Sequence, residues 1–146
     1  MFVGQYAHAI DEKGRLTIPS RFRDLVGQGA FITRGYDRNL MVMTEEYFSK
    51  VYDLINSMNI ADPLTRDLRR LIIGNAFGVE VDKAGRILLP QNQRQFLNFE
   101  SEAVVVGQGE YFEIWHPTDW QAVNDRLNDT EAMSARIATL NLAPGK

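Results

Sequence analysis

The chain has no cysteine and only two histidines, His8 and His116, among its 146 residues. Without cysteine there is neither a disulfide nor a thiolate zinc site, and this absence favours a cytoplasmic protein. Neither histidine lies in a metal-ligand pattern such as H-E-x-x-H. We therefore expect a cytoplasmic location, with no bound metal and no cofactor.

Long apolar runs and phosphate-binding glycine loops are also missing. No stretch reaches the roughly 18 apolar residues that suggest a membrane span. The N-terminus lacks the basic segment and apolar run of a signal peptide, so we expect none. The glycines form no G-x-G-x-x-G or P-loop pattern. We expect no membrane association and no small-molecule substrate, and we predict that the chain is not an enzyme.

A large excess of charge of one sign is absent as well. The formal net charge is −3, which taken as an average argues mildly against a nucleic-acid partner. The charge is unevenly distributed, because residues 1–38 hold six Lys/Arg and four Asp/Glu while residues 101–146 hold three and seven. A basic edge beside an acidic tail fits this distribution, and so does ordinary solvated charge.

The sequence does contain a repeated motif, D-x-x-G-R-x-x-x-P, at residues 11–19 and again 71 positions later at residues 82–90. The likeness extends beyond the motif, since Tyr6 matches Phe77, Ile10 matches Val81 and Phe48 matches Trp120. A half of about 50 residues would bury too little surface to be stable alone. The repeat therefore predicts two halves that share one core.

Each half shows the pattern of a strand, a tight turn, a second strand, a short helix, two more strands and a helix. The first two strands are expected at residues 5–10 and 15–18. Helical spacing of apolar residues predicts a helical pair within residues 45–73. A last amphipathic helix is expected from about Thr130, with Met133, Ile137 and Leu140 on one face, before the chain frays at residues 143–146.

The motif places basic side chains beside a tight turn in both halves. A guanidinium on a projecting turn suits phosphate contact or bidentate reading of guanine O6 and N7. The candidate DNA-binding residues are Arg15, Lys13, Arg86 and Lys83, and the candidate motif-structural residues are Asp11, Gly14, Asp82 and Gly85. An alternative reading is that each Asp and Arg form an intramolecular pair that only pins the hairpin.

Two further arginines, Arg21 and Arg23, follow Pro19 in the first half. We take Gln91 and Gln93 as their counterparts in the second half. On this matching the two halves either differ in their contacts or carry solvated arginines here.

Several segments together resemble the MraZ family of bacterial transcriptional regulators, which are relatives of the AbrB/SpoVT swapped-hairpin DNA-binding proteins. These segments are the N-terminal M-F-V-G-Q-Y, the D-x-K-G-R-L run, the L-I-I-G-N-A stretch before the second motif, and V-V-V-G-Q. The resemblance covers the chain to about residue 128.

The resemblance implies an α+β fold, a duplicated AbrB-like swapped-hairpin β-barrel with flanking helices. The chain would then be a pseudo-dimer in one polypeptide. The implied organisation is a first half at 1–51, a helical linker at 52–76, a second half at 77–124 and a C-terminal amphipathic helix and tail at 125–146.

The resemblance also implies the partners. They are double-stranded promoter DNA, bound at short G-rich direct repeats of the division and cell-wall gene cluster, and further copies of the chain in a ring-shaped homo-oligomer associated with the nucleoid. Arg15 is expected to dominate over Arg86, because Ala84 stands where the first motif has Lys13. An antitoxin-like or scaffold module that binds proteins through the same fold is the alternative.

Overall fold

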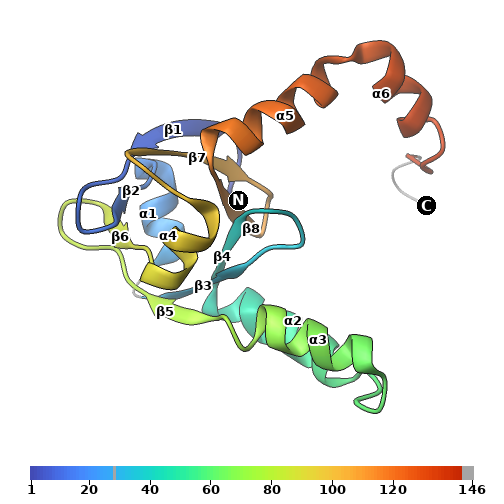
Figure 1. Cartoon of the computed structure of the whole chain (residues 1–146), viewed down its shortest axis with the longest axis horizontal. Helices are drawn as coiled ribbons and strands as arrows, with labels where there is room; N and C mark the ends of the chain where they lie inside the picture. The colour runs from blue at the N-terminus through green and yellow to red at the C-terminus, as the bar shows by residue number, and fades with distance from the viewer. Residues whose placement is uncertain (28, 143–146) are drawn as a thin grey trace.

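A computed structural model describes residues 1–27 and 29–142, which form a mixed α+β fold with six helices and antiparallel sheets (Figure 1). The strands are β1 (Gln5–Ala9), β2 (Arg15–Thr17), β3 (Ala30–Arg34), β4 (Leu40–Thr44), β5 (Phe77–Val79), β6 (Arg86–Leu88), β7 (Glu102–Gly107) and β8 (Tyr111–Trp115). The helices are α1 (Ser20–Val26), α2 (Glu45–Asn56), α3 (Pro63–Ile72), α4 (Gln91–Leu97), α5 (Pro117–Asn128) and α6 (Thr130–Ile137).

Both copies of the motif form the same strand-turn-strand unit. Gly14 and Gly85 have φ angles of 85° and 78°, which only glycine adopts without strain. In the first turn the amide of Gly14 donates to the carbonyl of Asp11 at 3.0 Å, and in the second the amide of Gly85 donates to the carbonyl of Asp82 at 3.0 Å. The strands predicted around the first motif are confirmed by β1 and β2.

The strands of the two halves are interleaved. The six-stranded sheet has the order β1-β7-β8-β4-β3-β5, so the first strand of each half pairs with the third strand of the other half. A separate two-stranded ribbon pairs β2 with β6, again across the halves. Within the described residues the larger sheet is open, with β1 and β5 as its edges, and it does not close into a barrel.

The main core draws residues from both halves. Phe22 of α1 is 1% exposed and lies with its ring centroid 5.0 Å from that of Phe2 and 5.1 Å from that of Phe112 on β8. Leu16 of β2 and Ile87 of β6 are fully buried in the same cluster. One buried cluster therefore contains residues that follow both copies of the motif.

The helical pair expected within residues 45–73 is confirmed by α2 and α3. Thr44 caps α2 by accepting the amide of Tyr47 at 3.2 Å, and Asp62 caps α3 by accepting the amide of Leu64 at 2.9 Å. The pair packs on a second apolar cluster whose fully or nearly fully buried members are Met41, Met43, Ile55 and Ile72.

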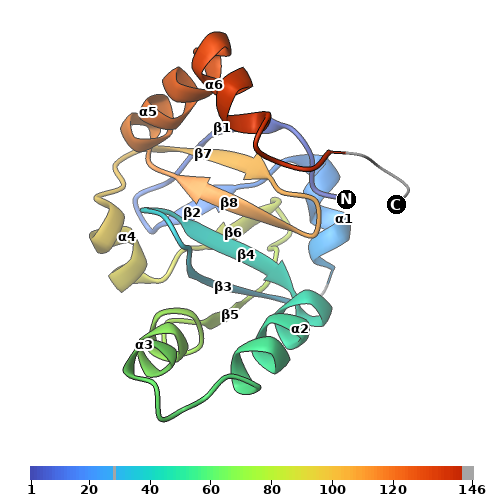
Figure 2. The same ribbon diagram turned by 90° about the vertical axis from the view of Figure 1, so that its right-hand side faces the viewer.

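The C-terminal helices leave the body at the end opposite the α2–α3 pair (Figures 1 and 2). Neither α5 nor α6 contains a buried residue. The predicted helical face is only partly correct, because α6 ends at Ile137 and Leu140 lies beyond it, 62% exposed. Residues 143–146, where we predict fraying, lie outside the described residues.

We expect the substitution Phe22→Ala to lower the free energy of unfolding by about 3–5 kcal/mol, because it leaves a cavity between aromatic rings of both halves. Chemical denaturation monitored by circular dichroism measures this loss. The control is Tyr36→Ala, since Tyr36 is 66% exposed and its removal leaves no cavity. Equal effects of the two substitutions would contradict a shared core centred on Phe22.

Candidate nucleic-acid interface

In the first turn, the carboxylate of Asp11 organises the backbone and the arginine together. Its Oδ1 accepts the amides of Lys13 at 3.0 Å and Arg15 at 2.9 Å, while its Oδ2 accepts Nε of Arg15 at 2.6 Å. A single carboxylate therefore fixes both the turn and the direction of the guanidinium of Arg15, four residues further along the chain. The Arg15 side chain stays 35% exposed.

The second turn repeats this arrangement. Oδ1 of Asp82 accepts the amides of Ala84 and Arg86, both at 2.9 Å, and Oδ2 accepts Nε of Arg86 at 3.0 Å. The structure thus contains the intramolecular Asp–Arg pair in both copies. Such a pair orients the arginine whether or not a ligand binds there.

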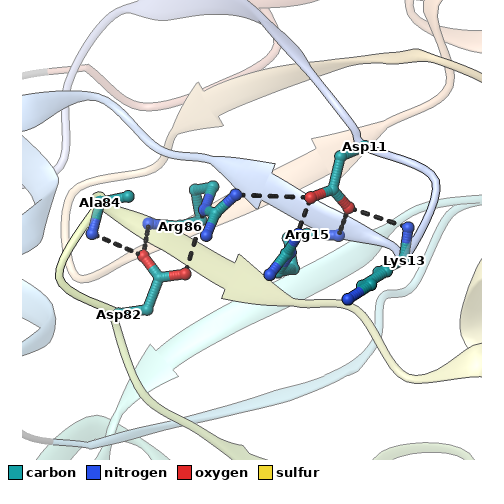
Figure 3. A network of polar contacts seen from close by, with 6 residues as sticks. All are labelled: Asp11, Lys13, Arg15, Asp82, Ala84 and Arg86. Carbon is teal, nitrogen blue, oxygen red and sulfur yellow. Dashed lines mark hydrogen bonds and ion pairs between the residues drawn. The ribbon is translucent and has the colours of Figure 1, made fainter.

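The ribbon of β2 and β6 brings the two turns into one network (Figure 3). The turns lie on the same side of the body (Figure 1), at opposite ends of the ribbon. Nη1 of Arg86 reaches across to Oδ2 of Asp11 at 3.4 Å. Within the described residues no matching contact joins Asp82 to Arg15, so the network is asymmetric.

Both aspartates are held in the ionised form. Backbone hydrogen bonding from Arg15 lowers the pKa of Asp11 from its ordinary value of 3.8, and the side chain and charge of Arg15 lower the pKa further. Backbone hydrogen bonding from Arg86 lowers the pKa of Asp82 in the same way, followed by the charge and side chain of Arg86. Two ionised carboxylates therefore balance the two motif arginines.

The ion pairs leave some of the basic nitrogen atoms at the turns available to bind a ligand. Arg15 uses only Nε, and neither of its terminal nitrogens makes a hydrogen bond or ion pair within the described residues. Arg86 engages both Nε and Nη1. Lys13 and Lys83 are exposed and form no ion pair with any described residue. The first turn therefore presents the freer guanidinium.

Sequence matching missed one pair of arginines beside the turns. The repeat offset of 71 places Arg94, rather than Gln93, opposite Arg23, so the matching with Gln91 and Gln93 is wrong. In the structure Arg94 lies against Gly14 and Arg23 lies against Gly85. Applying the motif offset strictly would have found this pair.

Metal centres and membrane spans have no candidate in the parts of the chain that the structure describes. No three His, Cys, Asp or Glu side chains there are grouped so that they could hold a metal ion. In the same parts, every helix is too short or too polar to cross a membrane.

Comparison with known proteins shows the family to which this chain belongs. A family model described as "MraZ protein, putative antitoxin-like" matches residues 1–71 and 72–141, so each matched segment of this chain contains one motif turn. The chain is 43% identical to the transcriptional regulator MraZ of Thermomicrobium roseum, over 96% of this chain and 99% of the relative. The chain belongs to the MraZ family.

Other relatives cover the chain to a similar extent. The transcriptional regulator MraZ of Roseiflexus castenholzii is 40% identical over 93% of this chain and 95% of its own length. That of Acetivibrio thermocellus is 34% identical over 97% of this chain and 100% of its own length. These relatives are named as regulators of transcription, and none of the three is named as an enzyme.

Acid should weaken the fold through the turn carboxylates. Because their folded-state pKa values are lowered, Asp11 and Asp82 contribute fully to stability above the ordinary value of 3.8. That contribution is lost as the pH falls from there through the lowered folded-state pKa. We expect Asp11→Asn to flatten the pH dependence of the free energy of unfolding between about pH 5 and pH 2.

Urea unfolding at a series of pH values measures this dependence. The control is Asp53→Asn on the exposed side of α2, which should keep the wild-type profile. An Asp11→Asn profile that is merely displaced downwards, with unchanged shape, would contradict the assignment of the acid response to this carboxylate.

Proposed function

We propose that this protein is a sequence-specific DNA-binding regulator of transcription. Its expected target is a set of short G-rich direct repeats in the promoter of the division and cell-wall gene cluster. The observation that carries the proposal is the guanidinium of Arg15, held on a projecting turn by Asp11 with its terminal nitrogens unengaged. The names of the relatives support a role in transcription.

The chemistry of guanine fits this arrangement. Guanine presents O6 and N7 as adjacent acceptors in the major groove, and the two terminal nitrogens of an arginine can donate to both. Asp11 fixes Nε, so the free pair of donors is already oriented before binding. Such a bidentate contact discriminates against a wrong base by about 1–3 kcal/mol.

The remaining basic residues suit contacts to the DNA backbone. Lys13 and Lys83 carry flexible ammonium groups that match phosphates without reading sequence. Arg86 shares its nitrogens with both aspartates, so we propose that it contributes less to base reading than Arg15. This ranking agrees with the sequence, in which Lys13 stands two residues before Arg15 whereas Ala84 stands two residues before Arg86.

We also propose that the interleaved strands form a duplicated swapped-hairpin fold of the barrel type, left open in the larger sheet, with halves at 1–51 and 77–124. The pairing of β1 with β7, β5 with β3 and β2 with β6 supports this reading. The segment 52–76 would link the halves, and the segment from residue 125 would form the C-terminal helical tail.

The net charge of −3 argues mildly against DNA binding by a single chain. A ring of several copies would offset this by presenting several basic turns together. We propose a nucleoid-associated homo-oligomer that presents many turns along one rim. Once one turn has bound a repeat, the other turns of the ring are held near the adjacent repeats. Their effective concentration at those repeats is therefore raised. The phosphate contacts should make binding strongly dependent on salt.

A second candidate function is an antitoxin-like or scaffold module that binds another protein. The description of the matching family model favours it, and so does the exposed apolar surface of the C-terminal segment. Leu127, Ile137 and Leu140 are 44%, 39% and 62% exposed. This function predicts capture of a protein partner, with no salt-sensitive binding of promoter DNA.

We expect Arg15→Ala to abolish binding to duplex DNA taken from upstream of the protein's own gene. The reason is the removal of the freest oriented guanidinium in each protomer. Gel-shift titration measures the affinity, while circular dichroism and sedimentation show that fold and oligomer size are kept. Arg15→Lys should also bind weakly, because an ammonium cannot make the bidentate contact.

The matched control is Arg70→Ala, which removes an exposed arginine paired with Asp67 on α3, away from the turns. It should bind DNA like the wild type. Unchanged affinity of Arg15→Ala would falsify the proposed function. Loss of the fold in that variant would instead show that the Asp–Arg pair serves structure alone.

A further inference from the structure

A second pair of arginines lies against the motif turns, each coming from the opposite half. A Cβ atom built on Gly14 would collide with the guanidinium of Arg94, which belongs to α4. A Cβ atom built on Gly85 would collide with the guanidinium of Arg23, which belongs to α1. Each guanidinium therefore packs directly on the bare backbone of a turn glycine.

The register of the ribbon explains why the contacts cross between the halves. The carbonyl of Gly14 accepts the amide of Leu89 at 2.9 Å, just before Pro90 opens α4. The carbonyl of Gly85 accepts the amide of Ile18 at 3.1 Å, just before α1. Each turn is thus next to the start of the helix of the other half.

No acidic group neutralises either arginine within the described residues. The side chain of Arg94 makes no hydrogen bond or ion pair there, and its Nε is buried without a partner. Arg23 donates only Nε, to the carbonyl of Ile18 at 3.3 Å. Glu100 lines the same hollow of about 460 Å³ as Arg94, yet the two side chains form no ion pair.

The charge of Arg23 affects the pKa of a neighbouring side chain. The pKa of His8 on β1 is lowered, first by burial and then by the positive charge of Arg23. A guanidinium that was fully paired with a carboxylate would have little such effect. The region beside the second turn is therefore positively charged, in line with the absence of an ion pair.

The two arginine pairs consequently differ in chemistry. Arg15 and Arg86 are balanced by Asp11 and Asp82. Arg23 and Arg94 keep an uncompensated charge, and their half-buried guanidinium groups are held by packing on glycine. A fixed, unpaired guanidinium beside a projecting turn is a ready site for a phosphate group.

We propose that Arg23 and Arg94 are phosphate-binding residues. Each would hold a DNA phosphodiester beside the turn of the opposite half, while the motif arginine of that turn faces the bases. The inference rests on the proposed DNA-binding function. It assigns the two arginine pairs different tasks, with the uncompensated pair supplying attraction to any duplex and the balanced pair supplying sequence preference.

The test uses the full-length protein and two duplexes of equal length, one from upstream of its own gene and one of random sequence. Affinities are measured by fluorescence anisotropy over a series of salt concentrations for Arg23→Ala, Arg94→Ala and the corresponding Lys variants. The Ala variants should weaken binding to both duplexes by a similar factor. The slope of log affinity against log salt should fall in magnitude by about 0.9 for each phosphate that the variant no longer neutralises.

The Lys variants keep the charge and should retain most of the salt slope. Matched controls are Arg21→Ala and Asn92→Ala, at equivalent positions of α1 and α4. Residues two positions apart on a helix point to nearly opposite sides, so both controls should keep the wild-type slope. Thermal melting of every variant checks the fold.

Three results would overturn the inference, and they are distinguishable. Wild-type slopes in both Ala variants would show that no phosphate is held by Arg23 or Arg94. Lys variants that bind as weakly as the Ala variants, with lower melting temperature and unchanged slope, would show a packing role alone. A wild-type protein without salt-dependent binding to either duplex would remove the proposed function itself, and this inference with it.

Discussion

The pairing of β2 with β6 is the interaction on which the rest of the structure depends. Each strand contributes only three residues, and each comes from a different half. The pairing buries Leu16 and Ile87 completely and brings both turns to one side of the body. It also sets α1 and α4 beside the turns of the opposite halves. Neither half can form this ribbon alone, which explains why the repeat occurs within one shared core.

The charges at the turns serve orientation more than stability. Partly exposed ion pairs contribute little to the free energy of folding. What the Asp11–Arg15 pair does provide is a fixed side-chain direction, achieved through three hydrogen bonds to a single carboxylate. A side chain that is already ordered loses less conformational entropy when it binds. The Asp11–Arg15 pair thus fixes the angle of the arginine donors, an effect larger than its contribution to stability.

Local chemistry determined which features the sequence could predict. The turns follow from Asp and Gly at fixed positions, and the helical pair follows from its caps and spacing, so both were predictable. The exchange of strands was implied by family resemblance, because hydropathy alone does not say which strands pair. The contacts of Arg23 and Arg94 depend on the ribbon register and were missed. Spacing also predicted a C-terminal apolar face, but within the described residues nothing buries it.

The contact between Asp11 and Arg86 makes the two ends of the β2–β6 ribbon unlike. Two identical chains related by a two-fold axis must make every such contact twice, and they present the same face in both directions. The two halves of this chain are not identical in sequence, so that requirement does not hold, and within the described residues the contact is made in one sense only. Its two ends can therefore differ in what they recognise. For the proposed binding to DNA, unlike ends would give the bound chain a direction along the duplex, which suits direct repeats rather than mirror-related pairs of sites.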